Sequence, residues 1–280
     1  MSIPMIARIK KGLKPLVDYC FSLLGYQVCL LTEVPSEGVE RAKLARLIEC
    51  LQPYLPDQRM IRLGPADGDG GYLLPDVLEG ITACFSPGVS NVSGFEKDCA
   101  EMGMKVFMAD HSVEAPAEEH SNFHFIKKFV GGTTSGIYVS LDDWVREMLP
   151  ATREDFLLQM DIEGQEYEVI FSASGELLNR FRIMIIEFHD LDQLWGRPFF
   201  QIASRAFEKI LQTHVCVHLH PNNCCGLRER GGLAVPKVME FTFLRRDYIH
   251  SDAKQRRFPN PLDRDNTSKK PIPLPECWYR

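Results

Sequence analysis

The sequence predicts an α/β protein built on a doubly wound, mostly parallel sheet. Apolar segments of strand length alternate with segments whose apolar residues recur at helical spacing. Several of the apolar segments end in acids or histidines, and ligands bind at the carboxyl ends of the strands in sheets of this kind. The last two strand candidates, 214–223 and 237–247, have no helical pattern between them, so we expect an antiparallel pair at one edge.

The predicted elements follow one another at regular intervals. Strands are expected at 81–88, 105–110, 123–130, 156–160 and 181–190, before the final pair. An amphipathic helix is predicted at 199–213, and IYVSLDDWVREML reads as a short strand that continues into a helix. The stretch RLGPADGDGGYLLPD, at 62–76, holds four glycines and is predicted to be irregular.

The length of 280 residues suits one large domain with additions at both ends. We predict an N-terminal helical extension over 1–57, an α/β domain over 58–250, and an irregular, proline-rich tail over 251–280.

Composition and charge narrow the class of protein. The chain is 45% hydrophobic and 25% charged, which is ordinary for a soluble globular protein. Its formal charge of −6 gives no global reason to expect nucleic acid as a partner, because such proteins usually carry a basic face. The nine cysteines are scattered without a CxxC pair, which favours buried thiols in a reducing cytoplasm over a disulfide framework or a zinc site.

The N-terminal segment 1–31 places basic residues before an apolar stretch. Asp18 and Gln27 interrupt that stretch, so stable insertion into a membrane is not expected. We predict an amphipathic helix that docks on the domain, with a peripheral membrane contact as the alternative. The N-terminal helices could also mediate a homodimer.

The first strand, turn and helix of the domain bear on the cofactor. Only Gly88 and Gly94 are present in SPGVSNVSGFE, so the turn lacks the G-x-G-x-x-G pattern of dinucleotide sites, and a Walker A motif is also absent. Asp110 lies about 20 residues further on, where a ribose-binding acid stands in such folds; a strand-end or capping role is the alternative. A glycine turn and a ribose acid without a pyrophosphate motif point to S-adenosylmethionine. The candidate cofactor contacts are Gly88, Ser90, Asn91, Asp110, His111 and Asp161.

Three segments carry a resemblance to a known family. VSLDDWVRE, FLLQMDIEGQEYEVI and FRIMIIEFHD resemble the core of the FkbM family of methyltransferases, closely over 139–190 and more weakly over 81–247. The glycine-poor turn at 87–91 departs from the fuller glycine pattern that members of that family often have. The positions that match the family's motifs are Leu141, Asp142, Asp143, Asp161, Ile162, Glu163, Gly164, Glu166 and Glu187.

The resemblance implies a Rossmann-like class I fold and a methyltransferase that depends on S-adenosylmethionine. Hydroxyl groups, often on sugars and other secondary metabolites, are the usual targets of the family. We therefore expect an O-methyltransferase that acts on a sugar or a nucleotide-linked sugar, in a pathway such as surface polysaccharide biosynthesis.

The acids and histidines at the strand ends are the candidate catalytic groups. A sugar hydroxyl needs a base, or a metal that lowers its pKa, before it attacks a methyl group. Asp161 ends one strand, and Glu187 and His189 end the next; adjacent strands lie about 4.8 Å apart, so these three side chains should converge. With His220 they could hold Mg²⁺, Mn²⁺ or Fe²⁺.

Four further residues are candidates for contact with the acceptor. Glu163 follows the same strand as Asp161, and the Asn222 and Asn223 side chains could bind a polyol, although asparagine is equally common as a turn former. Tyr72 could stack on a sugar or a base, or simply pack.

Two other functions remain open from the sequence. A metal-dependent hydrolase or lyase could use the same acids and histidines without a methyl donor. A non-catalytic, methyltransferase-like scaffold would account for the glycine-poor turn.

Overall fold

The structure is a computed structural model that describes residues 38–89, 91–150 and 154–280. Residues 38–280 form one compact unit. Helix α2 (Arg41–Cys50) therefore belongs to this unit, whereas the amphipathic helix predicted within 1–31 lies outside the described residues. The domain boundaries at 57/58 and 250/251 stay predictions. No helix in the described part of the chain is long and apolar enough to cross a membrane.

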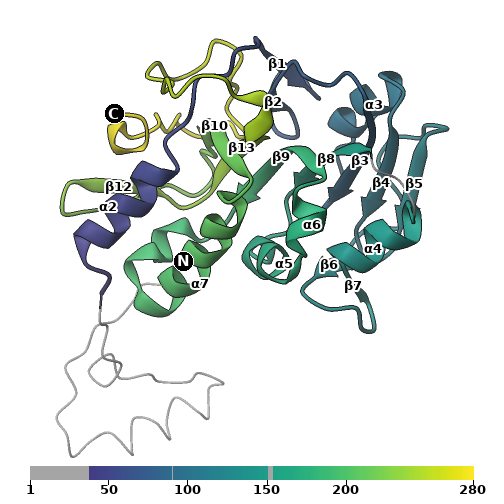
Figure 1. Cartoon of the computed structure of the whole chain (residues 1–280), viewed down its shortest axis with the longest axis horizontal. Helices are drawn as coiled ribbons and strands as arrows, with labels where there is room; N and C mark the ends of the chain where they lie inside the picture. The colour runs from purple at the N-terminus through teal and green to yellow at the C-terminus, as the bar shows by residue number, and fades with distance from the viewer. Residues whose placement is uncertain (1–37, 90, 151–153) are drawn as a thin grey trace, which may run out of the picture. The chain divides into compact units, whose positions relative to one another are not determined.

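A seven-stranded sheet forms the centre of this unit (Figure 1). The strands run in the order β10-β13-β9-β8-β3-β4-β5, and every neighbouring pair is parallel except the two that involve β13. The strands are β3 (Ile81–Pro87), β4 (Lys105–Ala109), β5 (Phe123–Ile126), β8 (Asp155–Met160), β9 (Phe181–Phe188), β10 (His214–Pro221) and β13 (Met239–Arg245). The predicted doubly wound, mostly parallel sheet with antiparallel pairing at one edge is confirmed.

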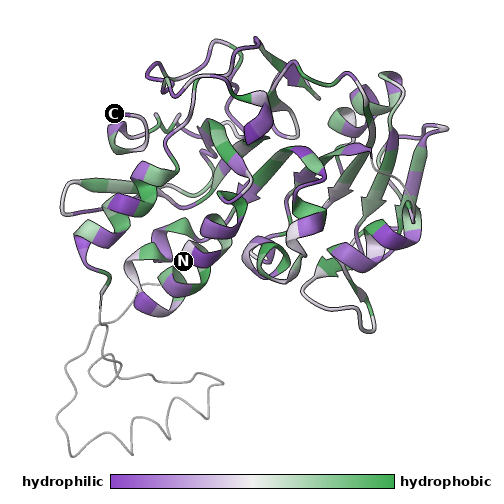
Figure 2. Ribbon diagram, viewed as in Figure 1, coloured by the Kyte–Doolittle hydropathy of each residue, from purple (hydrophilic) through white to green (hydrophobic). Residues whose placement is uncertain are grey.

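Both faces of the sheet are buried, because successive strand residues point to opposite sides. In β3, Phe85 belongs to the larger core cluster and its neighbour Cys84 to the smaller one. Figure 2 shows hydrophobic residues along the strands and mixed hydropathy along the helices. The larger cluster is covered by α2, α4 (Leu141–Met148), α5 (Glu166–Ser172), α6 (Gly175–Leu178) and α7 (Arg197–Ile210); the smaller one by α3 (Gly94–Glu101) and the strands β1 (Met60–Leu63) and β2 (Tyr72–Pro75).

The stretch 62–76 is more ordered than the sequence suggests. Its flanks pair as the antiparallel hairpin β1–β2, with Leu63 opposite Tyr72, so only the connection 64–71 lacks regular structure. The apolar YLLP segment packs against the smaller core cluster, and this burial outweighs the glycine content of the connection. Two further strand pairs are β6 (Phe129–Gly131) with β7 (Tyr138–Ser140), and β11 (Leu227–Arg230) with β12 (Leu233–Pro236). The 3-10 turn η1 (Leu191–Trp195) follows β9.

The C-terminal tail is irregular, as predicted, but it is anchored. Besides the turn η2 (Arg246–Tyr248) that precedes it, its one regular piece in the described chain is the 3-10 turn η3 (Glu276–Trp278). The Trp278 ring is fully buried, and its Nε1 donates a hydrogen bond to the Ala234 carbonyl at 3.0 Å. A large aromatic side chain of this kind stabilises a segment without a backbone ladder.

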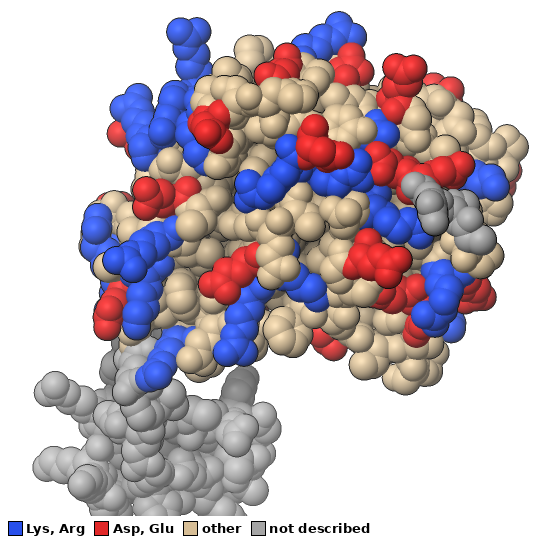
Figure 3. Space-filling model, in the orientation of Figure 1, with Lys and Arg blue, Asp and Glu red and all other residues tan. Residues whose placement is uncertain are grey.

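The cysteines and the surface charges agree with most of the sequence analysis. Cys84, Cys99 and Cys216 are buried free thiols. Cys224 and Cys225 are joined in a disulfide between neighbouring residues, which was not predicted. On the face drawn in Figure 3, basic and acidic side chains are interspersed, without one broad basic patch.

We expect His214 to make the fold sensitive to acid. Burial lowers the pKa of this histidine to about 4, and its Nε2 lies 2.6 Å from the Phe181 carbonyl oxygen. The unfolded chain takes up this proton near pH 6.5, whereas the folded chain does not until about pH 4. The free energy of unfolding should therefore fall as the pH drops from 6.5 to 4, by up to about 3 kcal/mol from this group.

Urea unfolding of the wild type and of His214→Gln across this pH range measures the effect. The variant should lose less stability on acidification than the wild type. Equal pH dependence in the two proteins would contradict the assignment.

Candidate active site

The backbone of the turn after β3 lies directly against the backbone at the end of β8. Gly88 has a φ of +86°, and a Cβ atom there would lie 1.6 Å from the Asp161 carbonyl oxygen. The Gly88 amide donates to the Ala109 carbonyl at 3.0 Å, and the Asp161 amide donates to the Pro87 carbonyl at 3.2 Å. Only glycine fits this position, and the ends of β3, β4 and β8 are held together there.

The other candidate cofactor residues lie around this turn in different environments. Asp110, at the end of β4, is buried, and one of its carboxylate oxygens accepts hydrogen bonds from the Ser112 amide at 2.7 Å and the Ser112 hydroxyl at 2.6 Å. The His111 ring lies 5.2 Å from the Phe129 ring, and Asn91 is exposed. Ser90 lies outside the described residues. Ribose binding by Asp110 remains a prediction.

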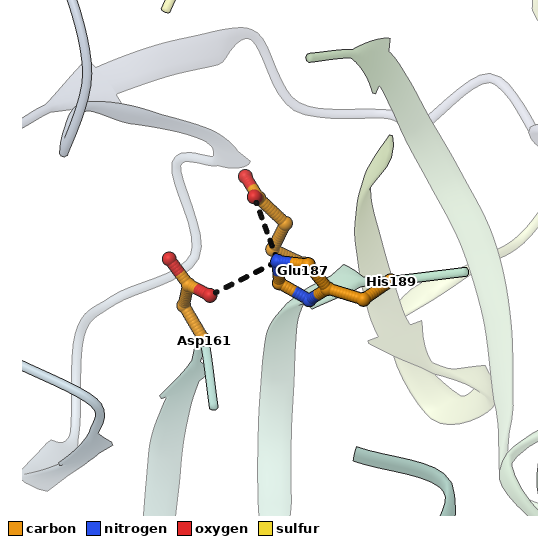
Figure 4. Close-up of side chains that lie close together, drawn as sticks. All are labelled: Asp161, Glu187 and His189. Atoms are coloured by element: carbon orange, nitrogen blue, oxygen red, sulfur yellow. Dashed lines mark ion pairs between the residues drawn. The ribbon is translucent and has the colours of Figure 1, made fainter. Parts of the chain in front are cut away.

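The three predicted catalytic residues lie side by side (Figure 4). Met160 of β8 pairs with Ile186 of β9, so the residues that follow them, Asp161 and Glu187, occupy neighbouring positions. The Nε2 atom of His189 lies 3.8 Å from a carboxylate oxygen of Asp161 and 3.6 Å from one of Glu187. One ligand atom from each residue lies within 4.8 Å of the others, which is close enough for a shared ion or proton.

Glu166 sets the orientation of the His189 ring. It is completely buried, lies 3.0 Å from His189 Nδ1, and accepts hydrogen bonds from the backbone amides of Ile162 and Gly164. The Tyr167 hydroxyl donates to the His189 carbonyl at 2.7 Å. A carboxylate on Nδ1 places a proton on that nitrogen, which leaves Nε2 directed at Asp161 and Glu187.

Burial dominates the electrostatics of the site. It raises the pKa of Asp161 to about 7 and the pKa of Glu187 well above its ordinary value, with the charges of neighbouring acids adding to the effect. For His189 burial lowers the pKa, but the hydrogen bond and charge of Glu166 and the charge of Asp161 outweigh it, so the net pKa is raised. The free site therefore binds protons tightly, as expected for crowded acids.

Two acids outside the predicted set extend the site along β13. Glu240 stands opposite Glu187 in the β13–β9 register, and Asp69 reaches the same place from the 64–71 connection. Asn266 of the tail donates to both Glu240, at 2.8 Å, and Asp69, at 3.0 Å. Burial raises the pKa of Glu240 to about 8. Glu240 was detectable as the one charged residue in the apolar run VMEFTFL.

The candidate acceptor residues divide into two groups. The Asn222 side chain donates to the Glu187 carboxylate at 3.2 and 3.3 Å, and Glu163, largely exposed, lies 3.5 Å from His189 Nε2. Asn223 instead holds the tail, because its side chain donates to the Thr267 and Lys269 carbonyls. The Tyr72 ring is buried and lies nearly perpendicular to the Phe95 ring.

His220 does not join Asp161, Glu187 and His189. Strand β13 lies between β9 and β10, which places the end of β10 about 10 Å from the end of β9. His220 instead lies 3.8 Å from Asp263 and lines a cavity of about 240 Å³ under the tail. The sequence did not show that a later strand inserts between these two.

Comparison with known proteins agrees with this arrangement. Residues 88–214 match the family model described as the methyltransferase FkbM domain. The predicted resemblance is confirmed, and the matched segment contains Gly88, Asp161, Glu187 and His189. No curated protein matches the chain.

Two solved methyltransferase structures show similarity to this chain at low identity. One is the 1,6-didemethyltoxoflavin-N1-methyltransferase of Burkholderia thailandensis, solved with 1,6-didemethyltoxoflavin and S-adenosylhomocysteine; it is 14% identical, covers 60% of this chain and 72% of that chain, and has a TM-score of 0.31. Another is a mutant of the 16S rRNA (adenine(1408)-N(1))-methyltransferase of Catenulisporales acidiphilia, with 11% identity, coverage of 66% and 98%, and a TM-score of 0.27.

We expect Gly88→Ala to destabilise the domain far more than Gly103→Ala. Both glycines have a left-handed backbone, but nothing lies within 4 Å of a Cβ at Gly103. Gly103→Ala should therefore lower the free energy of unfolding by only about 1–2 kcal/mol, through backbone strain alone. A Cβ at Gly88 must in addition push the end of β8 away. Urea unfolding of both variants measures the difference, and equal losses would contradict the close approach.

We expect Glu166→Gln to lower the pKa of His189. The substitution removes the charge that outweighs burial, while the amide oxygen can still accept from Nδ1. NMR titration of the His189 ring in chelator-treated protein measures the shift. Glu168→Gln, an exposed position on the same helix, is the matched control. An unchanged His189 pKa in Glu166→Gln would show that this carboxylate does not govern the ring.

Proposed function

We propose that the chain is an S-adenosylmethionine-dependent O-methyltransferase that acts on a hydroxyl group of a sugar or a nucleotide-linked sugar. The observation that supports this most is the convergence of Asp161, Glu187 and His189 at strand ends directly beside the glycine turn. The methyltransferase family supplies the reaction class.

In this proposal the methyl donor binds over the ends of β3 and β4. Gly88 allows the ends of β3 and β8 to lie side by side, and the buried Asp110 carboxylate stands at the neighbouring strand end, where it can accept from ribose hydroxyls. The donor then lies next to Asp161. The acceptor occupies the far side of Asp161, above Glu187 and His189.

Methyl transfer is an in-line displacement, so the residues must position the acceptor and remove its proton. His189 is suited to take that proton on Nε2, because Glu166 holds Nδ1. The O–H bond of the acceptor breaks as the new oxygen–methyl bond forms, and the methyl–sulfur bond breaks to leave neutral S-adenosylhomocysteine. The charges of Glu166 and Asp161 stabilise the imidazolium that results.

A divalent cation such as Mg²⁺ or Mn²⁺ also fits these residues. Two carboxylates and one imidazole form a suitable donor set, and the carboxylate–histidine contact of Glu166 is the usual support for a metal-bound histidine. Asp161 Oδ1 is buried and has no hydrogen-bond partner among the described residues. Asp161, Glu187 and His189 would hold the ion, which would lower the pKa of the acceptor hydroxyl.

If the acceptor is a nucleotide-linked sugar, the acids of the site favour the binding of its sugar part beside β9 and β13, and not of its phosphates. Asp69, Glu187 and Glu240 lie within 4.8 Å of one another. Their carboxyl groups can bind hydroxyl groups, whereas a phosphate there would meet like charges. If the acceptor carries a nucleotide, that part must extend away from β9 and β13.

Calorimetric titration of chelator-treated protein with S-adenosylmethionine, with and without Mn²⁺, tests the proposal. We expect the donor to bind and Asp161→Ala to lose at least a hundredfold in turnover on sugar acceptors, measured as S-adenosylhomocysteine released, because both alignment and proton removal depend on this carboxylate. Glu208→Ala, on the exposed side of α7, is the control and should remain active.

The outcomes separate the competing functions. Metal binding without donor binding would favour the hydrolase. A protein that binds neither metal nor donor would favour the scaffold. Full turnover by a folded Asp161→Ala protein would overturn the catalytic role of Asp161.

A further inference from the structure

A chain of four buried polar side chains crosses the smaller core cluster beneath the glycine turn. Ser86 lies on β3 directly before Pro87, Glu96 in the first turn of α3, Gln159 near the end of β8, and Tyr72 at the start of β2. Their exposed fractions are 0%, 4%, 3% and 5%. The chain therefore joins β2, β3, α3 and β8, and two of these strands, β3 and β8, lead into the candidate site.

Consecutive members of the chain lie at hydrogen-bonding distance. Ser86 Oγ is 2.5 Å from Glu96 Oε1 and 2.7 Å from Gln159 Oε1, and Gln159 Nε2 donates to the Tyr72 hydroxyl oxygen at 3.1 Å. Ser86 has one hydroxyl proton and cannot donate to both oxygens. With the amide in this orientation, Ser86 donates to Gln159, so Glu96 must carry a proton and donate to Ser86.

A neutral carboxyl group at this position also agrees with its surroundings. Burial raises the pKa of Glu96 to about 7, and the hydrogen bonds from Ser86 and its own backbone oppose this only in part. Three titratable groups of the smaller core cluster are Cys84 of β3, which interacts with Glu96, Cys99 of the same helix, and Tyr72 of β2. Burial raises the pKa of Cys84 and of Tyr72 well above their ordinary values, so both stay neutral when Glu96 titrates.

Loss of the Glu96 proton would reverse every donor in the chain. Ser86 would turn its hydroxyl proton to the Glu96 carboxylate. The Gln159 amide would rotate by half a turn and donate to Ser86. Its oxygen would then accept the hydroxyl proton of Tyr72. One proton leaves to solvent, and the rest of the change is a rotation of existing groups.

We propose that the proton on Glu96 sets the direction of this chain, and so determines whether Tyr72 offers its own hydroxyl proton to the candidate active site. With Glu96 neutral, the Tyr72 proton has no acceptor among the described residues and is available to an oxygen atom of a bound ligand. The Tyr72 hydroxyl contacts Gln159, which stands on β8 two residues before Asp161, so the chain ends at the strand that leads into the site. The charges of Asp161 and Glu187 also contribute to the raised pKa of Tyr72, after burial. With Glu96 ionised, Gln159 takes this proton.

In this inference Glu96, Ser86 and Gln159 are positioning residues. They act through Tyr72 and have no contact with the ligand of their own. The inference concerns the hydrogen-bond chain and does not depend on the reaction that the site performs.

NMR of protein labelled with ¹³Cζ-tyrosine tests the direction of the chain without methyl donor or acceptor. The Tyr72 signal, assigned among the eight tyrosines with Tyr72→Phe, should titrate with a midpoint near pH 7. In Glu96→Gln the new amide donates to Ser86 at every pH. The Tyr72 signal should therefore stay at its low-pH position.

Two controls separate this effect from others. Glu101→Gln, at the exposed end of the same helix, should leave the titration unchanged. Asp161→Asn should also leave it in place, which excludes the direct charge of Asp161 as its cause. Ser86→Ala should abolish it by breaking the chain, and this variant keeps the test decisive if Glu96→Gln does not fold.

A Tyr72 signal that does not titrate between pH 5.5 and 8.5 in the wild type would overturn the inference. So would a titration that persists in both Glu96→Gln and Ser86→Ala. Failure of the methyltransferase proposal would instead appear as absent donor binding, which this experiment does not measure.

Discussion

The close approach of the Gly88 turn to the Asp161 carbonyl is the constraint on which the site depends. A side chain at Gly88 would occupy the space of that carbonyl, so β3 and β8 can end at the same level only with glycine there. The backbone bonds from Gly88 to Ala109 and from Asp161 to Pro87 bring the end of β4 into the same arrangement. A donor molecule bound over this turn therefore lies next to the acids that follow β8 and β9.

The second organising feature is the burial of acids on the face of the sheet that carries the smaller core cluster. Glu96, Glu187 and Glu240 are each at most 6% exposed, and their pKa values are raised because water is excluded. Buried charges need compensation, which here comes from protons, from the amides of Asn222 and Asn266, and in the proposed function from a cation. Glu166 differs, because two backbone amides and His189 support it directly.

Much of the central site could be predicted because parallel strands bring their carboxyl ends to one edge. Asp161, Glu187 and His189 follow apolar strands directly, and the register of β8 and β9 places them together. Glu240 and Asp69 were missed for a different reason. One comes from a reversed strand and the other from a connection after β1, so neither stands at the end of a parallel strand.

The sequence by itself determined the doubly wound sheet, the glycine turn and the family, because periodicity and short motifs are local properties of the chain. Tertiary structure decided which distant residues meet. Strand β13 inserts between β9 and β10, and this separates His220 from the site while it brings Glu240 into it. The anchored tail supplies Asn266, and the core places the Tyr72 ring nearly perpendicular to the Phe95 ring. Such contacts depend on strand order and side-chain packing, and no local pattern in the sequence encodes them.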